Sequence, residues 1–143
     1  MRLQLFKKLG TQNQKGMTLL EIVIVVAILA TLGSVLVGQV MKQLNKAKFN
    51  EAKLRMGQIS NALDMYYTDC GKYPSDLTGL LEKDDCNNWG PESYLKGKKD
   101  LLDPWNTEFQ YAVNGSSYEI RSLGADRREG GDGNNKDISN VDE

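Results

Sequence analysis

The strongest constraint on the fold of this chain is an apolar run at Ile22–Val37. Only Thr31, Gly33 and Ser34 interrupt it with residues that are not apolar. As a helix, these 16 positions extend roughly 24 Å, and roughly 30 Å when Met17–Leu20 are added, which is enough to cross a bilayer. The run is too long and too rich in valine for an ordinary signal peptide, and no A-x-A cleavage site follows it. We therefore expect the mature protein to keep it.

Charge is distributed unevenly around this run. Four of the 18 basic residues and none of the 19 acidic ones lie in residues 1–16, so this segment carries +4 and the remainder carries −5. A basic segment before an apolar helix stays on the cytoplasmic side, which predicts a single-pass protein with a cytoplasmic N-terminus. The remainder has no basic patch, so we expect no nucleic-acid partner. The absence of histidine removes the commonest general base and zinc ligand.

Glu21 is a carboxylate at the start of the apolar run, and two roles are open for it. The stretch Thr18-Leu19-Leu20-Glu21 fits the capping box of a helix N-terminus, and a carboxylate in the first turn suits the helix dipole. Alternatively, an ionisable group in a membrane span needs a partner. If the chain is cut after Gly16, the new amine of Met17 in one subunit could pair with Glu21 of a neighbour. The two roles are compatible.

The stretch KGMTLLEIVIVVAILATLG resembles the class III signal of type IV pilins and type II secretion pseudopilins. In that family a short basic leader ends in glycine, prepilin peptidase cuts before the apolar segment and methylates the new N-terminus, and the fifth mature residue is glutamate. The resemblance implies cleavage between Gly16 and Met17, methylation of Met17 and an assembly role for Glu21. Met17 departs from the usual Phe, and Gly38 stands where many members have Pro.

A helical period continues beyond the apolar run. No proline occurs from Met17 to Lys72, so we predict one helix over residues 17–68 that is apolar all round at first and amphipathic later. Gly71 supplies the left-handed stop, and Pro74 prevents continuation. The amphipathic half carries an apolar stripe at Ala52, Met56, Ile59, Leu63 and Tyr66.

The residues after the helix predict a short helix at Asp76–Lys83 and a β-hairpin. Large apolar side chains recur at every second position, at Phe109, Tyr111 and Val113 and again at Tyr118 and Ile120, and Asn114-Gly115 lies between the two segments. An Asn-Gly dipeptide between alternating segments is the strongest short hairpin signal. The predicted fold is α+β, with the long helix packed on a small antiparallel sheet.

Later stretches narrow the resemblance. LDMYYTDCGKYPSDLTGLL, DPW and YEIRSLGAD are similar to stretches of the major pseudopilins of type II secretion systems. The resemblance spans nearly the whole chain and implies a type IV pilin-like fold in three parts. These are a leader at 1–16 that is removed, a transmembrane and filament-core helix at 17–40, and a periplasmic domain at 41–143.

The resemblance also implies a function. Such a subunit waits in the bacterial inner membrane and is added to a helical filament, the periplasmic pseudopilus, which drives folded proteins across the outer membrane. Its implied partners are copies of itself, minor pseudopilins, the inner-membrane assembly platform and prepilin peptidase. We expect it not to be an enzyme. One alternative is a type IV pilus subunit for adhesion or motility. The other is a membrane-anchored periplasmic enzyme or adaptor, and the sequence shows no nucleophile–base pair that would indicate an enzyme.

The C-terminal stretch SLGADRREGGDGNNKDI combines four acidic residues with four glycines. From the residues alone, a solvated acidic tail is the simpler interpretation, although calcium binds hard oxygens of this kind. The resemblance to major pseudopilins implies instead one bound calcium ion. By position, Asp126 and Asp137 would supply carboxylates, and Leu123 and Arg128 would supply backbone carbonyls. Arg127-Arg128 replaces a glycine-containing segment of the family pattern.

Cys70 and Cys86 lie outside the apolar run. If that part of the chain is exported, the pair can form a disulfide that closes a modest loop and stabilises the domain by about 3 kcal/mol. The alternative is two unrelated thiols. The pair is an addition to the family pattern.

Overall fold

The computed structural model describes residues 16–142, so the predicted leader lies outside the described residues except for Gly16. The chain divides into two units between Gln39 and Val40, and each is described by itself. The elements, in order, are α1 (Leu19–Cys70), η1 (Leu77–Leu80), η2 (Lys98–Leu101), β1 (Gln110–Asn114), β2 (Ser117–Ser122), η3 (Gly133–Asn135) and β3 (Ile138–Ser139).

The first unit consists of the N-terminal part of α1, and its apolar side chains have no cover. The least exposed large apolar side chain between Leu19 and Val37 is Ile22, at 41%. By length and composition this helix is able to cross a membrane. The hydroxyls of Thr31 and Ser34 donate to the carbonyls of Ile28 and Thr31, each at 2.8 Å. Burial in lipid would therefore leave neither hydroxyl without a partner.

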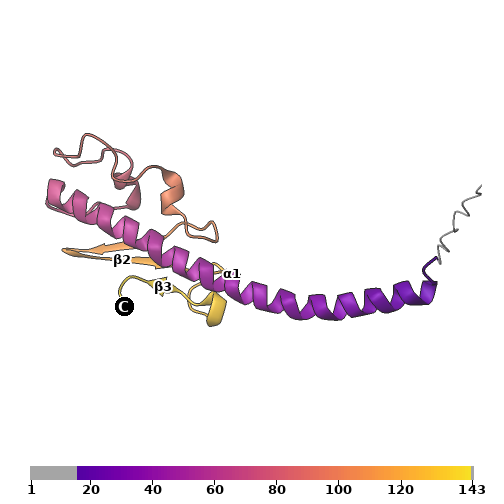
Figure 1. Ribbon diagram of the computed structural model, residues 1–143. Coiled ribbons are helices and arrows are strands. Elements are labelled where there is room, and N and C mark those ends of the chain that lie inside the picture. The colour runs from indigo at the N-terminus through magenta and orange to yellow at the C-terminus, as the bar shows by residue number, and fades with distance from the viewer. Residues whose placement is uncertain (1–15, 143) are drawn as a thin grey trace, which may run out of the picture. The chain divides into compact units, whose positions relative to one another are not determined.

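In the second unit, the amphipathic part of α1 packs on the sheet (Figure 1). The core joins the helix to Leu80, Phe109 and Ile120. The helix predicted over 17–68 is confirmed, and Gly71 ends it with a left-handed φ of 69°. The predicted apolar stripe is also confirmed, with one further member. The buried residues of α1 are Ala52, Met56, Ile59, Ala62, Leu63 and Tyr66.

The sheet is antiparallel with strand order β1-β2-β3, which confirms the predicted α+β class. Asn114 pairs with Ser117, so the hairpin turn is Gly115-Ser116, one residue later than the Asn-Gly dipeptide indicates. The sequence does not predict strand β3, because its two residues are too few to show an alternating period. The helix predicted at 76–83 is only the 3-10 turn η1, where the Asp76 carboxylate accepts from the Thr78 N–H at 2.8 Å.

Candidate functional site

The N-terminus of α1 carries the residues predicted for processing and assembly. Thr18 Oγ1 accepts a hydrogen bond from the Glu21 N–H at 3.2 Å, which forms one half of the capping box. Among the described residues, none donates a hydrogen bond to the Glu21 carboxylate, and Glu21 is exposed. Gly16 and Met17 precede the helix and are also exposed. Cleavage, methylation and charge pairing at these residues stay predictions.

The expected disulfide joins Cys70, the last residue of α1, to Cys86, with the two Cα atoms 5.6 Å apart. Two tyrosines anchor the same loop to the helix. The Tyr66 hydroxyl donates to Asp84 Oδ2 at 2.6 Å, and the Tyr94 hydroxyl donates to an aspartate of α1 at 2.7 Å. The segment after the helix is therefore held in place by a covalent bond and by side-chain hydrogen bonds.

Asp103, the first residue of the DPW motif, is 2% exposed and accepts three hydrogen bonds. The N–H groups of Trp105 and Thr107 donate to Oδ1 at 3.0 and 2.8 Å, and the Ser122 hydroxyl donates to Oδ2 at 2.7 Å. Ser122 ends β2, where the acidic loop begins. Asp103 therefore joins the turn before the sheet to the start of that loop.

The neck of the acidic loop is closed by the pairing of Ser122 with Ile138. This pairing brings the two ends of the loop, Leu123 and Asp137, onto neighbouring chain segments. A Cβ on Gly124 would lie 2.9 Å from the carbonyl oxygen of Lys136, and one on Gly131 would lie 2.5 Å from that of Asn135. The backbone of the loop is thus folded closely on itself at positions where only glycine fits.

The predicted carboxylate ligands are held by the loop backbone. Asp126 Oδ1 accepts from the Arg128 N–H at 3.1 Å, and Asp137 Oδ2 accepts from the Gly130 N–H at 3.0 Å. Asp137 Oδ1 is buried with no hydrogen-bond partner, which suits a bound cation, because a buried carboxylate oxygen is costly when nothing compensates it. Residues 16–142 contain no group of three or more His, Cys, Asp or Glu that could hold a metal, so carbonyls would have to complete the shell.

One of the two arginines of this loop, Arg127, directs its side chain to a residue outside the loop. Arg127 has a left-handed φ of 59°, and its Nη2 donates to the carbonyl of Trp105 at 3.1 Å. Arg128 contributes the N–H that Asp126 accepts. The departure from the family pattern at Arg127 is thereby accommodated by a contact with the turn of the DPW motif.

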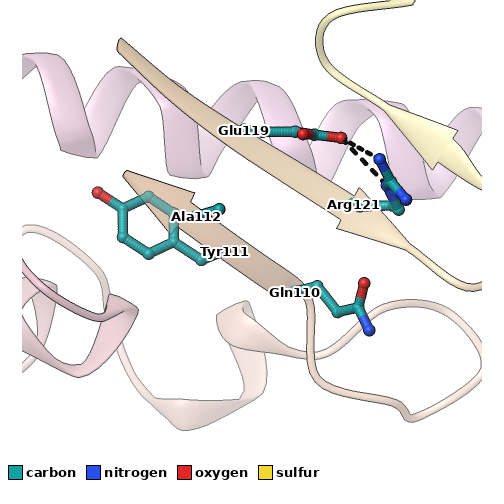
Figure 2. Close-up of a pocket in the computed structure, with 5 residues that line it drawn as sticks. All are labelled: Gln110, Tyr111, Ala112, Glu119 and Arg121. Carbon is teal, nitrogen blue, oxygen red and sulfur yellow. Dashed lines mark hydrogen bonds and ion pairs between the residues drawn. The ribbon is translucent and has the colours of Figure 1, made fainter. Parts of the chain in front are cut away.

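A shallow cleft of about 480 Å³ lies on the outer face of the sheet, and sequence reasoning did not single it out (Figure 2). Arg121 donates to Glu119 Oε1 from Nε at 3.1 Å and from Nη2 at 2.5 Å. These hydrogen bonds, followed by the charge of Arg121, hold the pKa of Glu119 below its usual value. The signal was present in the alternation of β2, which puts both side chains on the face opposite Ile120.

Comparison with known proteins agrees with this architecture. Residues 39–141 match the family model "Type II secretion system (T2SS), protein G", and residues 11–37 match "Prokaryotic N-terminal methylation motif". Type II secretion system core protein G of Pseudomonas aeruginosa is 41% identical over 140 residues, covering 92% of this chain and 97% of the relative. The protein of the same name from Vibrio cholerae is 36% identical over 137 residues, covering 90% of this chain and 92% of the relative.

A solved structure supports the fold. The major pseudopilin of the type 2 secretion system of enterohaemorrhagic Escherichia coli aligns with a TM-score of 0.60 at 24% identity, over 72% of this chain and 94% of that chain. An apolar N-terminal helix that continues into a small α+β domain is the architecture of a pilin-like subunit, and the helix together with the methylation motif fits a membrane anchor. The chain belongs to the type II secretion system protein G family. That membership favours the secretion subunit over the pilus subunit.

Proposed function

We propose that this chain is the major structural subunit of a type II secretion pseudopilus, which drives the export of folded proteins across the outer membrane. The observation that carries the proposal is the exposed apolar surface of α1 between Leu19 and Val37. Such a helix is stable in lipid and equally stable in a bundle of its copies, because both surroundings are apolar. Moving from membrane to filament therefore exchanges one apolar environment for another.

The starting state is a single-pass protein of the bacterial inner membrane, with the C-terminal domain in the periplasm. Prepilin peptidase removes the basic leader between Gly16 and Met17 and methylates the Met17 amine. The charge asymmetry around the apolar run supports this orientation, and so does the match to a methylation motif. The Cys70–Cys86 disulfide is consistent with an oxidising compartment.

Glu21 sets the register of the assembled filament. The hydroxyl of Thr18 already caps the Glu21 N–H, and no described residue bonds the Glu21 carboxylate. In the filament that carboxylate pairs with the Met17 amine of a neighbouring copy. The pairing offsets the cost of an ionised group in an apolar bundle and fixes the axial position of one helix against the next.

The acidic loop binds one calcium ion. The carboxylates of Asp126 and Asp137 and the carbonyls of Leu123 and Arg128 would hold it. The unpartnered oxygen of Asp137 and the close-folded backbone at the loop neck support this assignment. A bound divalent cation would supply fixed positive charge that draws these oxygens together. The loop, and with it the lateral surface of the subunit, would be ordered.

The partners of the subunit are further copies of itself, minor pseudopilins, the inner-membrane assembly platform and prepilin peptidase. The family is one of secretion-system core proteins, and we assign no catalytic role to any residue. Nucleic acid is not among the proposed partners.

Complementation of a secretion-deficient strain that lacks this subunit tests the proposal. The wild-type chain should restore export of a folded enzyme to the medium. Glu21→Gln should insert in the membrane but fail to restore export, whereas Glu51→Gln, which removes an exposed carboxylate of α1, should restore it. Long surface fibres at normal expression, without restored export, would identify a pilus subunit instead.

A further inference from the structure

The Glu119–Arg121 ion pair lies on β2, beside β3 and next to the neck of the acidic loop. Arg121 and Ser139 are register partners of β2 and β3. The Ser139 hydroxyl donates to Glu119 Oε1 at 3.2 Å, the same oxygen that accepts two hydrogen bonds from Arg121. The guanidinium is therefore fixed by the Glu119 carboxylate (Figure 2), and that carboxylate is itself bonded to Ser139 of β3.

The strand register also brings Arg121 within reach of the loop. Asp137 lies two residues before Ser139, on the diagonal of the Arg121–Ser139 pair, and diagonal neighbours are within the range of long side chains. The electrostatics agree with this placement. Glu119 raises the pKa of Arg121 most, through its hydrogen bonds and its charge, and the charges of Asp137 and Glu129 raise it further.

Asp137 has one oxygen to offer. Its Oδ2 accepts the Gly130 N–H, whereas its Oδ1 is buried without a partner. A guanidinium released from Glu119 would bind that oxygen, since bonds between arginine and carboxylate are strong and charge-assisted. The same oxygen is the one that a metal ion would need. Arg121 and a cation are thus alternative partners for Asp137.

We propose that the Glu119–Arg121 ion pair sets the calcium affinity of the loop by keeping the Arg121 guanidinium off Asp137. The inference rests on the proposed calcium site. Glu119 binds and neutralises the guanidinium, which leaves Asp137 Oδ1 to the metal ion. Lys53 and Lys136 line a second cavity, of about 190 Å³, together with Asp137. Both lysines are kept in the variants described below. A change in calcium affinity between these variants is therefore due to the Glu119–Arg121 pair.

Calcium titration of the full-length processed chain in detergent, by isothermal calorimetry, tests this inference. Glu119→Gln should raise the Kd for calcium roughly fivefold to tenfold, the effect of one freed charge acting on a divalent ion at about 7 Å in water. Arg121→Gln should lower the Kd by a similar factor. The double variant should return close to the wild-type value. Glu51→Gln, which opens the matched Glu51–Arg55 pair on α1, should leave the Kd unchanged.

Arg121→Lys separates charge placement from a merely structural role. Lysine keeps the positive charge but lacks the fork that makes two hydrogen bonds to one carboxylate, so its variant should bind calcium more weakly than wild type. Thermal melts in chelator show whether each variant is folded. Equal Kd values in folded Glu119→Gln, Arg121→Lys and wild type would overturn the inference and leave the calcium site standing. No calcium binding by the wild type would overturn the calcium site itself.

Discussion

The Asp103 carboxylate accepts a hydrogen bond from the Ser122 hydroxyl at 2.7 Å, across a separation of 19 residues. Both residues are buried. The contact joins the turn that precedes the sheet to the end of β2, where the acidic loop begins. The shape of the loop neck therefore depends on a residue outside the loop.

Asp103→Asn should destabilise the domain by about 1.5–3 kcal/mol, because hydrogen bonds to a buried charged group are lost or reversed. The amide oxygen can still accept from the Trp105 and Thr107 N–H groups, but its NH₂ group would face the Ser122 hydroxyl. Urea denaturation measures the change. Ser117→Ala, which removes an exposed hydroxyl of the same strand, should change stability little. An unchanged midpoint for Asp103→Asn would contradict the role given to this carboxylate.

Replacing both cysteines, Cys70→Ala with Cys86→Ala, should lower the free energy of unfolding by about 3 kcal/mol, since the disulfide closes a loop of this size. Its sequence separation is 16 residues. Denaturation with and without reductant supplies the control. Reductant should lower the free energy of unfolding of the wild type and leave that of the double variant unchanged. Equal stability of the oxidised and reduced wild type would show that the loop is held by its hydrogen bonds alone.

Stability should fall as pH rises from 10 to 12. Burial raises the pKa of Tyr111 from 10.0 to about 12, and burial likewise raises the pKa of Tyr66. Between these pH values the unfolded state loses phenol protons that the folded state keeps, which favours unfolding. Tyr111→Phe should flatten this dependence, while lowering stability at neutral pH through loss of its hydrogen bond to Pro74. An equally steep fall in Tyr111→Phe would disprove the contribution of this phenol.

Calcium should raise the melting temperature of the subunit, and chelator should reverse the effect. At a hundredfold excess over Kd, a ligand that binds only the folded state stabilises it by about 2.7 kcal/mol. Asp137→Asn and Asp126→Ala should abolish the shift, whereas Asp85→Asn, an exposed acid outside the loop, should keep it. A wild-type melt that is indifferent to calcium and chelator would remove the calcium site from the proposal.

Gly16→Ala should leave an uncut precursor in the membrane. A Cβ at Gly16 meets nothing within 4 Å, so failure to cleave would reflect recognition by the peptidase rather than misfolding. Intact-mass measurement of the purified chain distinguishes the products, and the wild type should begin at a methylated Met17. Gly38→Ala, at another open glycine, should be processed normally. Normal cleavage of Gly16→Ala would place the site elsewhere.

Much of the second unit was predictable because its determinants are local or periodic. The stripe from Ala52 to Tyr66 recurs at helical spacing, and Gly71 with Pro74 marks the end of the helix. The hairpin followed from alternation on either side of a turn dipeptide. The turn itself lies one residue later, because the pairing of Asn114 with Ser117 is settled by strand register and not by the dipeptide.

The sequence by itself determined the apolar span, the long helix, the hairpin and the family to which they belong, since each depends on neighbours along the chain. Only the tertiary structure decided the contacts between distant residues. These include the Ser122–Ile138 pairing that closes the loop, the bond from Ser122 to Asp103 and the unpartnered oxygen of Asp137. The physical reason is that burial and hydrogen-bond satisfaction depend on what surrounds an atom in space, and no spacing of residue types records that.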